Sequence, residues 1–199
     1  MDPILLATKT QISPLTRQLV ARTQLVSLLD NNVVLHKLTL LSAPAGYGKT
    51  TSLVQWAHLA SRPVAWLSLD EEDNDFHRYF RYVLEAWHRT HPEIIDSPLG
   101  LLLSGINPQA DDVLPSFINI ADRLERDLAI VLDDFHLIAD ESILRALAYL
   151  VDHLPPHLNF VWLAARIRRS LWHATVRAAN YWKFASPICA SCPQRPLNS

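Results

Sequence analysis

The chain has 199 residues, 49% hydrophobic and 19% charged, with a formal net charge of −2, which is typical of one globular domain with a substantial core and excludes a disordered chain. The near-neutral charge argues against a surface dominated by nucleic-acid contacts, because binding to phosphate backbones needs clustered Lys and Arg. No apolar stretch is as long as a membrane span, and the first residues lack the basic start of a secretory signal, so we expect a cytoplasmic protein without membrane contact.

Residues 1–37 form a lead-in segment, in which Leu25, Leu28 and Leu29 recur at helical spacing and predict a short amphipathic helix. The apolar run at residues 38–42 predicts the first strand. Residues 49–60 predict a helix directly after the next loop. The sequence therefore predicts a strand, a loop and a helix in immediate succession.

The loop between this strand and this helix has the composition of a phosphate-binding loop. Such a loop needs backbone N–H groups curled around an anion, a helix N-terminus aimed at the anion, a Lys for the β- and γ-phosphates and a hydroxyl ligand for Mg²⁺. The usual pattern begins with Gly, where this chain has Ala43, and the alternative is a Gly-rich turn that binds nothing. The predicted nucleotide-binding residues here are Ala43, Pro44, Ala45, Gly46, Tyr47, Gly48, Lys49, Thr50 and Thr51.

The middle of the chain alternates between apolar and polar segments. A second strand at residues 64–69 ends at an acidic turn over residues 70–75. Aromatic and aliphatic residues at helical spacing predict a core helix over residues 76–89. We expect an irregular connection around a short apolar piece at residues 92–110, followed by a helix at about 111–127.

The last regular elements complete the predicted fold. A buried strand at residues 128–132 precedes a helix at 141–153 and a fourth strand at 158–164. Strands that alternate with helices predict an α/β fold in which a parallel sheet is covered by helices on both faces. We assign residues 38–166 to this core.

Two acids follow the strand at residues 128–132. A nucleotide site that uses Mg²⁺ needs an acid at a neighbouring strand tip to hold the metal ion, and Asp133 is in that position. Asp134 would then orient or deprotonate the attacking water, and Arg166 would sense the γ-phosphate. The alternatives are strand-end acids in a turn and a solvent-exposed Arg.

Together these motifs resemble the LuxR-type large ATP-binding transcription regulators, which belong to the STAND class of P-loop switches. The resemblance covers about residues 4–166. In that family Ala commonly opens the loop, as Ala43 does here. The matching motifs, in chain order, are Thr8-Lys9, residues 19–22, residues 43–51, residues 65–70 with 73–75, and residues 131–136.

The resemblance implies an ATP-driven switch in which ADP holds an inactive form and ATP with an inducer permits self-association and promoter binding. Hydrolysis would be slow and would reset the switch. By resemblance, Val20 and Arg22 lie near the adenine, Lys49 and Thr50 hold phosphate and Mg²⁺, Asp133 holds the metal ion, and Arg166 is the sensor. The resemblance also implies that the strand at residues 158–164 lies between those at 38–42 and 128–132, with the strand at 64–69 outermost.

Residues 167–199 do not resemble the continuation of that family, whose sensor and DNA-binding regions would lie beyond Arg166. Any DNA contact would therefore require a domain absent from this chain. Read one base earlier, a back-translation of residues 180–199 permits a family-like strand sequence, so we suspect a frameshift, with a genuine atypical tail as the alternative. The strand that pairs with residues 38–42 would then be lost, leaving an open edge, or replaced by residues 181–184.

Two other interpretations compete with that of a switch module. A small-molecule kinase would share the P-loop, although the basic lid and the acceptor site of such kinases are not apparent in the sequence. A non-functional gene remnant is the third interpretation. Measurement of phosphate transfer to small acceptors against simple ATP hydrolysis would separate the first two.

Overall fold

The computed structural model describes residues 5–15, 23–44, 46–105, 108–164 and 181–185. Within these ranges one parallel sheet has the strand order β2-β3-β4-β1-β5. This order confirms that β4 lies between β1 and β3 and that β2 is outermost. The strands are β1 (Leu38–Ser42), β2 (Val64–Ser68), β3 (Leu128–Asp133), β4 (Leu158–Ala164) and β5 (Tyr181–Ala185).

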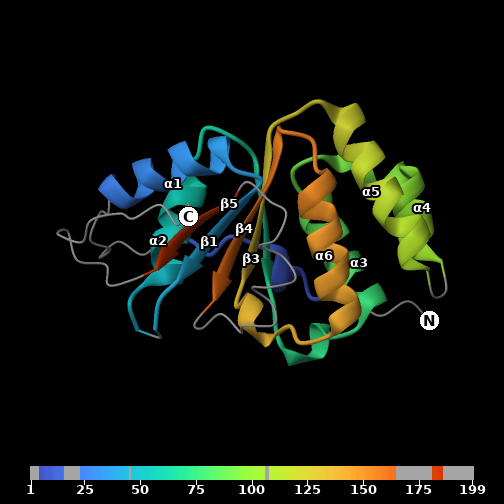
Figure 1. Cartoon of the computed structure of the whole chain (residues 1–199), viewed down its shortest axis with the longest axis horizontal. Coiled ribbons are helices and arrows are strands. Elements are labelled where there is room, and N and C mark those ends of the chain that lie inside the picture. The colour runs from blue at the N-terminus through green and yellow to red at the C-terminus, as the bar shows by residue number, and fades with distance from the viewer. Residues whose placement is uncertain (1–4, 16–22, 45, 106–107, 165–180, 186–199) are drawn as a thin grey trace, which may run out of the picture.

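Helices cover both faces of the sheet (Figure 1). On one face lie α1 (Thr23–Leu35) and α2 (Lys49–Leu59). The opposite face carries α3 (Phe76–His88), α4 (Pro98–Ser104), α5 (Ala110–Leu124) and α6 (Glu141–His153). The fold is therefore the predicted α/β arrangement of a P-loop protein.

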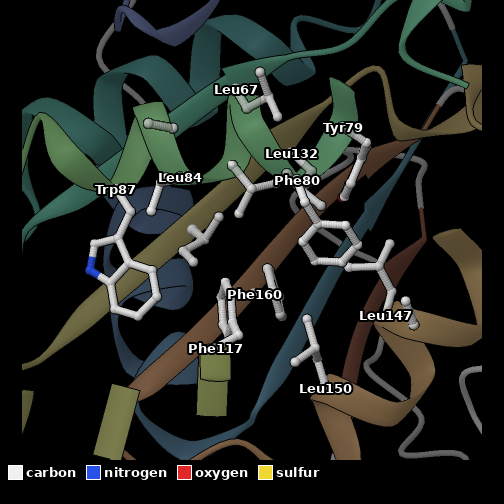
Figure 2. Close-up of a cluster of buried hydrophobic side chains, with 14 of the residues drawn as sticks. Leu67, Tyr79, Phe80, Leu84, Trp87, Phe117, Leu132, Leu147, Leu150 and Phe160 are labelled. Atoms are coloured by element: carbon white, nitrogen blue, oxygen red, sulfur yellow. The ribbon is translucent and has the colours of Figure 1, made fainter. Parts of the chain in front are cut away.

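Each strand supplies side chains to two separate cores, because successive residues of a strand point to opposite faces. In β3, Ile130 and Leu132 pack beneath α3 to α6, whereas Ala129 and Val131 pack beneath α1 and α2. Figure 2 shows the larger core, in which Phe80 of α3 and Phe117 of α5 lie over the sheet. Burial on both faces explains why these strands are almost continuously apolar.

Short 3₁₀ turns connect or flank the main elements. They are η1 (Ala7–Thr10), η2 (Glu71–Asp73), η3 (Pro92–Asp96) and η4 (Phe135–Leu137). Turn η1 packs against the outer strand β2, so it shields a sheet edge that would otherwise be available to other chains. The lead-in segment thus packs onto the core through η1 and α1.

The region at residues 92–110 is more regular than the sequence suggested. It contains η3 and the two-turn helix α4. Pro98 is the first residue of α4, where a missing N–H group breaks no helical hydrogen bond, and the Ser97 side chain accepts from the N–H group of Gly100 at 3.3 Å. The expected irregular connection was wrong because these residues begin a helix here instead of interrupting one.

The edge beside β1 is occupied by β5, which pairs with it in parallel from Leu38 opposite Tyr181 to Ser42 opposite Ala185. Of the two expected outcomes for this edge, an open strand or replacement by residues 181–184, the structure shows the second. The remainder of the 167–199 tail lies outside the described residues. Its origin stays a prediction.

Candidate functional site

The loop that joins β1 to α2 has the backbone curvature that an anion-binding loop needs. Gly46 and Gly48 adopt left-handed conformations, with φ of 85° and 71°, which L side chains rarely adopt. A Cβ atom at Gly46 would meet nothing within 4 Å, so backbone conformation and not space favours Gly there. Gly48 is also the residue that caps α2.

Lys49 is the first residue of α2, and its side chain returns toward the start of the loop. Its Nζ donates to the carbonyl oxygens of Ala43 at 2.6 Å and Pro44 at 3.0 Å. The first N–H groups of an α-helix have no acceptor within the helix and favour negative charge. The ammonium group and the helix N-terminus therefore lie at the same end of β1.

Thr50 and Asp133 meet across the sheet. The hydroxyl Oγ1 of Thr50 donates to Oδ1 of Asp133 at 3.4 Å. The contact joins the first turn of α2 to the carboxyl end of β3, although β4 separates β1 from β3. The structure thus brings together the two residues that the sequence proposed as metal ligands.

Asp133 is almost completely enclosed, with only 5% of its surface exposed. Its pKa is raised from 3.8 to about 6, chiefly by burial and also by the neighbouring carboxylate of Asp134. The N–H group of Asp134, the Thr50 hydroxyl and the charge of Lys49 oppose this shift. The residue is a buried acid whose charge a cation would stabilise.

Asp134 is held differently from its neighbour. Its φ of 55° is left-handed, and its N–H group donates to Oδ1 of Asp133 at 2.9 Å. Its side chain is 55% exposed, and its Oδ1 lies 3.8 Å from Nδ1 of His136. The buried acid and the accessible acid therefore stand side by side at the end of β3, in environments suited to different roles.

The acidic turn after β2 is a structural junction that the sequence did not identify. Asp73 is fully buried and pairs with Lys9 and with Nε of Arg78, the latter at 3.2 Å. Lys9 also reaches Asp70 at 2.9 Å and lies over the ring of Tyr82. The signal was present in the Lys9 and Asp73 motifs, but their partnership spans 64 residues of sequence.

Four predicted site residues lie outside the described residues, namely Val20, Arg22, Ala45 and Arg166. Their roles stay predictions. Among the described residues, no group of three or more His, Cys, Asp or Glu side chains is arranged to hold a metal ion. No helix among the described residues is both long enough and apolar enough to cross a membrane.

Relatives of known name match most of the chain. MalT, an HTH-type transcriptional regulator of Vibrio cholerae, is 35% identical over 147 residues, which are 71% of this chain and 16% of MalT. PknK, a serine/threonine-protein kinase of Mycobacterium tuberculosis, is 34% identical over 159 residues, 78% of this chain and 14% of PknK. MalT of Yersinia pestis is 33% identical over 152 residues, 73% of this chain and 16% of that protein.

Solved structures share the fold at low sequence identity. Cdc6p of Pyrobaculum aerophilum has a TM-score of 0.54 and 20% identity, covering 87% of this chain and 48% of Cdc6p. A Walker-type ATPase of Pyrococcus abyssi has a TM-score of 0.53 and 18% identity, covering 88% of this chain and 57% of the ATPase. No protein-family model matches the chain.

The chain spans only 14% to 16% of the length of these curated relatives. The similarity therefore concerns one segment of each relative. The chain has the fold of P-loop ATPases, and it belongs to the family of the MalT-type transcriptional regulators, of which it matches one segment.

Proposed function

We propose that this chain is an ATP-binding switch module of a MalT-type regulator, with at most slow ATP hydrolysis. The observation that carries the proposal is the meeting of Thr50 and Asp133 beside a loop with left-handed Gly46 and Gly48. A hydroxyl and a carboxylate at the carboxyl ends of parallel strands are the parts that a nucleotide site requires. The proposed core is residues 38–166, with residues 1–37 as its lead-in.

The side chains present fit a magnesium nucleotide. Mg²⁺ prefers oxygen ligands, and the oxygens of Thr50 and Asp133 lie 3.4 Å apart. These two residues would hold the metal ion, and Lys49 with the backbone N–H groups of residues 46–51 would bind the phosphates, within the predicted loop at residues 43–51. Bound there, the metal ion would neutralise charge on the phosphate oxygens. Thr50 would then give up its hydrogen bond to Asp133 and hold the metal ion together with it.

Asp134 would act on the attacking water. Its side chain is accessible, whereas that of Asp133 is enclosed. An accessible carboxylate next to the phosphate site can orient a water molecule or accept its proton. Hydrolysis would reset the switch, and by family resemblance Val20 and Arg22 would lie near the adenine, with Arg166 as the γ-phosphate sensor.

The relatives support a module that is used by proteins of more than one activity. The same segment matches proteins named as a transcriptional regulator and as a protein kinase. A segment that occurs in both a transcriptional regulator and a protein kinase is better explained as a shared nucleotide-dependent control element than as the part that regulates transcription or the part that acts as a kinase. Self-association, a promoter as the target of an attached DNA reader, and a cytoplasmic location belong to this proposal.

Analysis of the reaction products of radiolabelled ATP tests the proposal against the kinase alternative. We expect inorganic phosphate, formed slowly, and no labelled product from a panel of small hydroxyl and amine acceptors. Asp134→Asn should slow hydrolysis far more than it weakens ATP binding, because its role is exercised on the water and not on the bound phosphates. Rapid transfer of label to an acceptor would establish the kinase instead.

A further inference from the structure

The segment between β3 and α6 carries Asp134 in a backbone conformation that is unfavourable for a residue with a side chain. Its φ of 55° and ψ of 32° lie in the left-handed region. Such conformations persist only where neighbouring groups hold them. Which groups hold this segment therefore decides where the Asp134 carboxylate points.

Two contacts fix the first half of the segment. The N–H group of Asp134 donates to Asp133 Oδ1 at 2.9 Å. The ring of Phe135 is buried and stacks on Trp162 of β4, with centroids 4.2 Å apart. The N–H groups of Leu137 and Ile138 donate back to the carbonyl oxygens of Asp134 and Phe135 at 3.0 and 3.2 Å, and the Ile138 side chain is buried. These contacts leave the carbonyl oxygen of Leu137 and the N–H groups of residues 139 and 140, in the second half of the segment, to a partner from elsewhere in the chain.

Asn74, from the turn after β2, holds that second half. Its Nδ2 donates to the carbonyl oxygen of Leu137 at 3.0 Å. Its Oδ1 accepts from the N–H groups of Ala139 at 2.6 Å and Asp140 at 3.0 Å. Nδ2 also donates to the carbonyl oxygen of Glu71 at 3.0 Å. Both donors and both acceptor positions of the amide are thus used.

The turn that carries Asn74 is itself firmly anchored. The preceding Asp73 has no exposed surface and accepts from Lys9, from Arg78 at 3.2 Å and from the N–H group of Asp70 at 2.9 Å. At the end of β2, the N–H group of Leu69 donates to the carbonyl oxygen of Asp133 at 3.1 Å. Asn74 therefore projects from a rigid support and not from a free loop.

We propose that Asn74 is a positioning residue that fixes the 134–140 segment and thereby the direction of the Asp134 carboxylate. The inference rests on the proposed function, since positioning matters only if Asp134 acts on a water molecule. Asn74 touches neither nucleotide nor water in this role. It acts through the backbone, where a small misplacement of a catalytic group is enough to slow a reaction strongly.

The test compares Asn74→Ala with Asp75→Ala in the full chain. Asp75 belongs to the same turn and caps α3 by accepting from the N–H group of Arg78 at 2.8 Å. Among the described residues, no hydrogen bond or ion pair joins Asp75 to residues 134–140. It therefore controls for a general weakening of the turn. Hydrogen exchange of residues 134–140 gives a readout that does not depend on activity.

For Asn74→Ala we expect exchange in residues 134–140 to accelerate by roughly tenfold or more, as loss of the bonds to Ala139 and Asp140 requires. The single-turnover hydrolysis rate should fall by about tenfold while the Kd for ATP with Mg²⁺ changes by less than about twofold. Asp75→Ala should change neither exchange in this segment nor the rate. Asn74→Asp keeps the two accepted bonds and should retain most of the protection of Ala139 and Asp140.

Other outcomes overturn the inference. Unchanged exchange in Asn74→Ala would show that the amide does not hold the segment, whether or not the protein hydrolyses ATP. Faster exchange with an unchanged hydrolysis rate would show that the segment does not direct Asp134. An equal loss of ATP affinity and rate would mark a general structural role. Failure of the wild-type chain to bind ATP would instead refute the proposed function.

Discussion

Thr50 and Asp133 lie 3.4 Å apart, Oγ1 to Oδ1, although the strands that lead to them are separated by β4. The contact arises because α2 begins over the carboxyl end of the sheet, where the tip of β3 also lies. The same geometry buries Asp133 and raises its pKa.

The raised pKa of Asp133 predicts that this residue destabilises the protein without Mg²⁺ and nucleotide. The pKa of Asp133 in the folded protein is about 6 and its ordinary value is 3.8, so the free energy of unfolding should fall as the pH rises from about 4 to about 7. A shift of about two units corresponds to about 3 kcal/mol. Asp133→Asn should therefore stabilise the metal-free protein at pH 7.5 by about 2 to 3 kcal/mol and have little effect near pH 4.

Urea unfolding of both proteins at the two pH values measures this difference. The Asn side chain keeps Oδ1 as an acceptor for Thr50 and for the N–H group of Asp134. A variant that is less stable than the wild type at pH 7.5 would show that the charge of Asp133 is already well compensated in the metal-free protein.

Replacement of Thr39, in the strand that precedes the phosphate-binding loop, should stabilise the protein. Its hydroxyl is buried in β1 and has no hydrogen-bond partner among the residues that the structure describes. A buried polar group without a partner carries a desolvation penalty, and Val has nearly the same shape. Thr39→Val should raise the free energy of unfolding by about 1 kcal/mol. Thermal unfolding checks this, and a lowered midpoint would reveal a partner for the hydroxyl.

Replacement of Lys9, a residue of the lead-in segment, should strongly destabilise the protein. Lys9→Met keeps most of the aliphatic stem but removes the ammonium group that pairs with the fully buried Asp73. Arg78 remains as a partner of Asp73 at 3.2 Å. We therefore expect the free energy of unfolding to fall by about 3 kcal/mol, which is at the low end for a broken buried ion pair. Addition of Asp73→Asn should recover part of it.

Denaturant unfolding measures the Lys9 effect, with Arg145→Met as the matched control. Arg145 forms an exposed pair with Glu141 on α6, and exposed pairs contribute little. The control should therefore behave like the wild type. Equal stability of Lys9→Met and the wild type would mean that the lead-in segment is not held by this ion pair.

Local pattern was enough to predict the main elements and the two ends of the site. The strand at residues 38–42 and the helix from Lys49 follow from apolar runs and loop composition, and the structure places them within a residue or two. The position of β4 between β1 and β3 followed from family resemblance. Pro98 was misleading because the same residue breaks a helix interior but favours a helix start.

Long-range polar contacts were beyond prediction from the sequence. Asp70, Asp73 and Asp75 look alike in an acidic run, yet Asp73 alone has no exposed surface. Its partner Lys9 is 64 residues away, and Asn74 reaches Leu137 across 63 residues. Such pairings depend on how η1 and the turn after β2 pack in three dimensions, and no local periodicity encodes them.

Equilibrium titration with a fluorescent ATP analogue and Mg²⁺ tests the central claim most directly. Lys49→Ala should abolish measurable binding, because it removes the ammonium group beside the loop at residues 43–48. Lys37→Ala is the matched control, since this Lys precedes β1 at the opposite end of the strand and donates to the carbonyl oxygen of Asp152. The account predicts that the wild type and Lys37→Ala bind alike while Lys49→Ala does not bind. Equal affinity of the wild type and Lys49→Ala would contradict it.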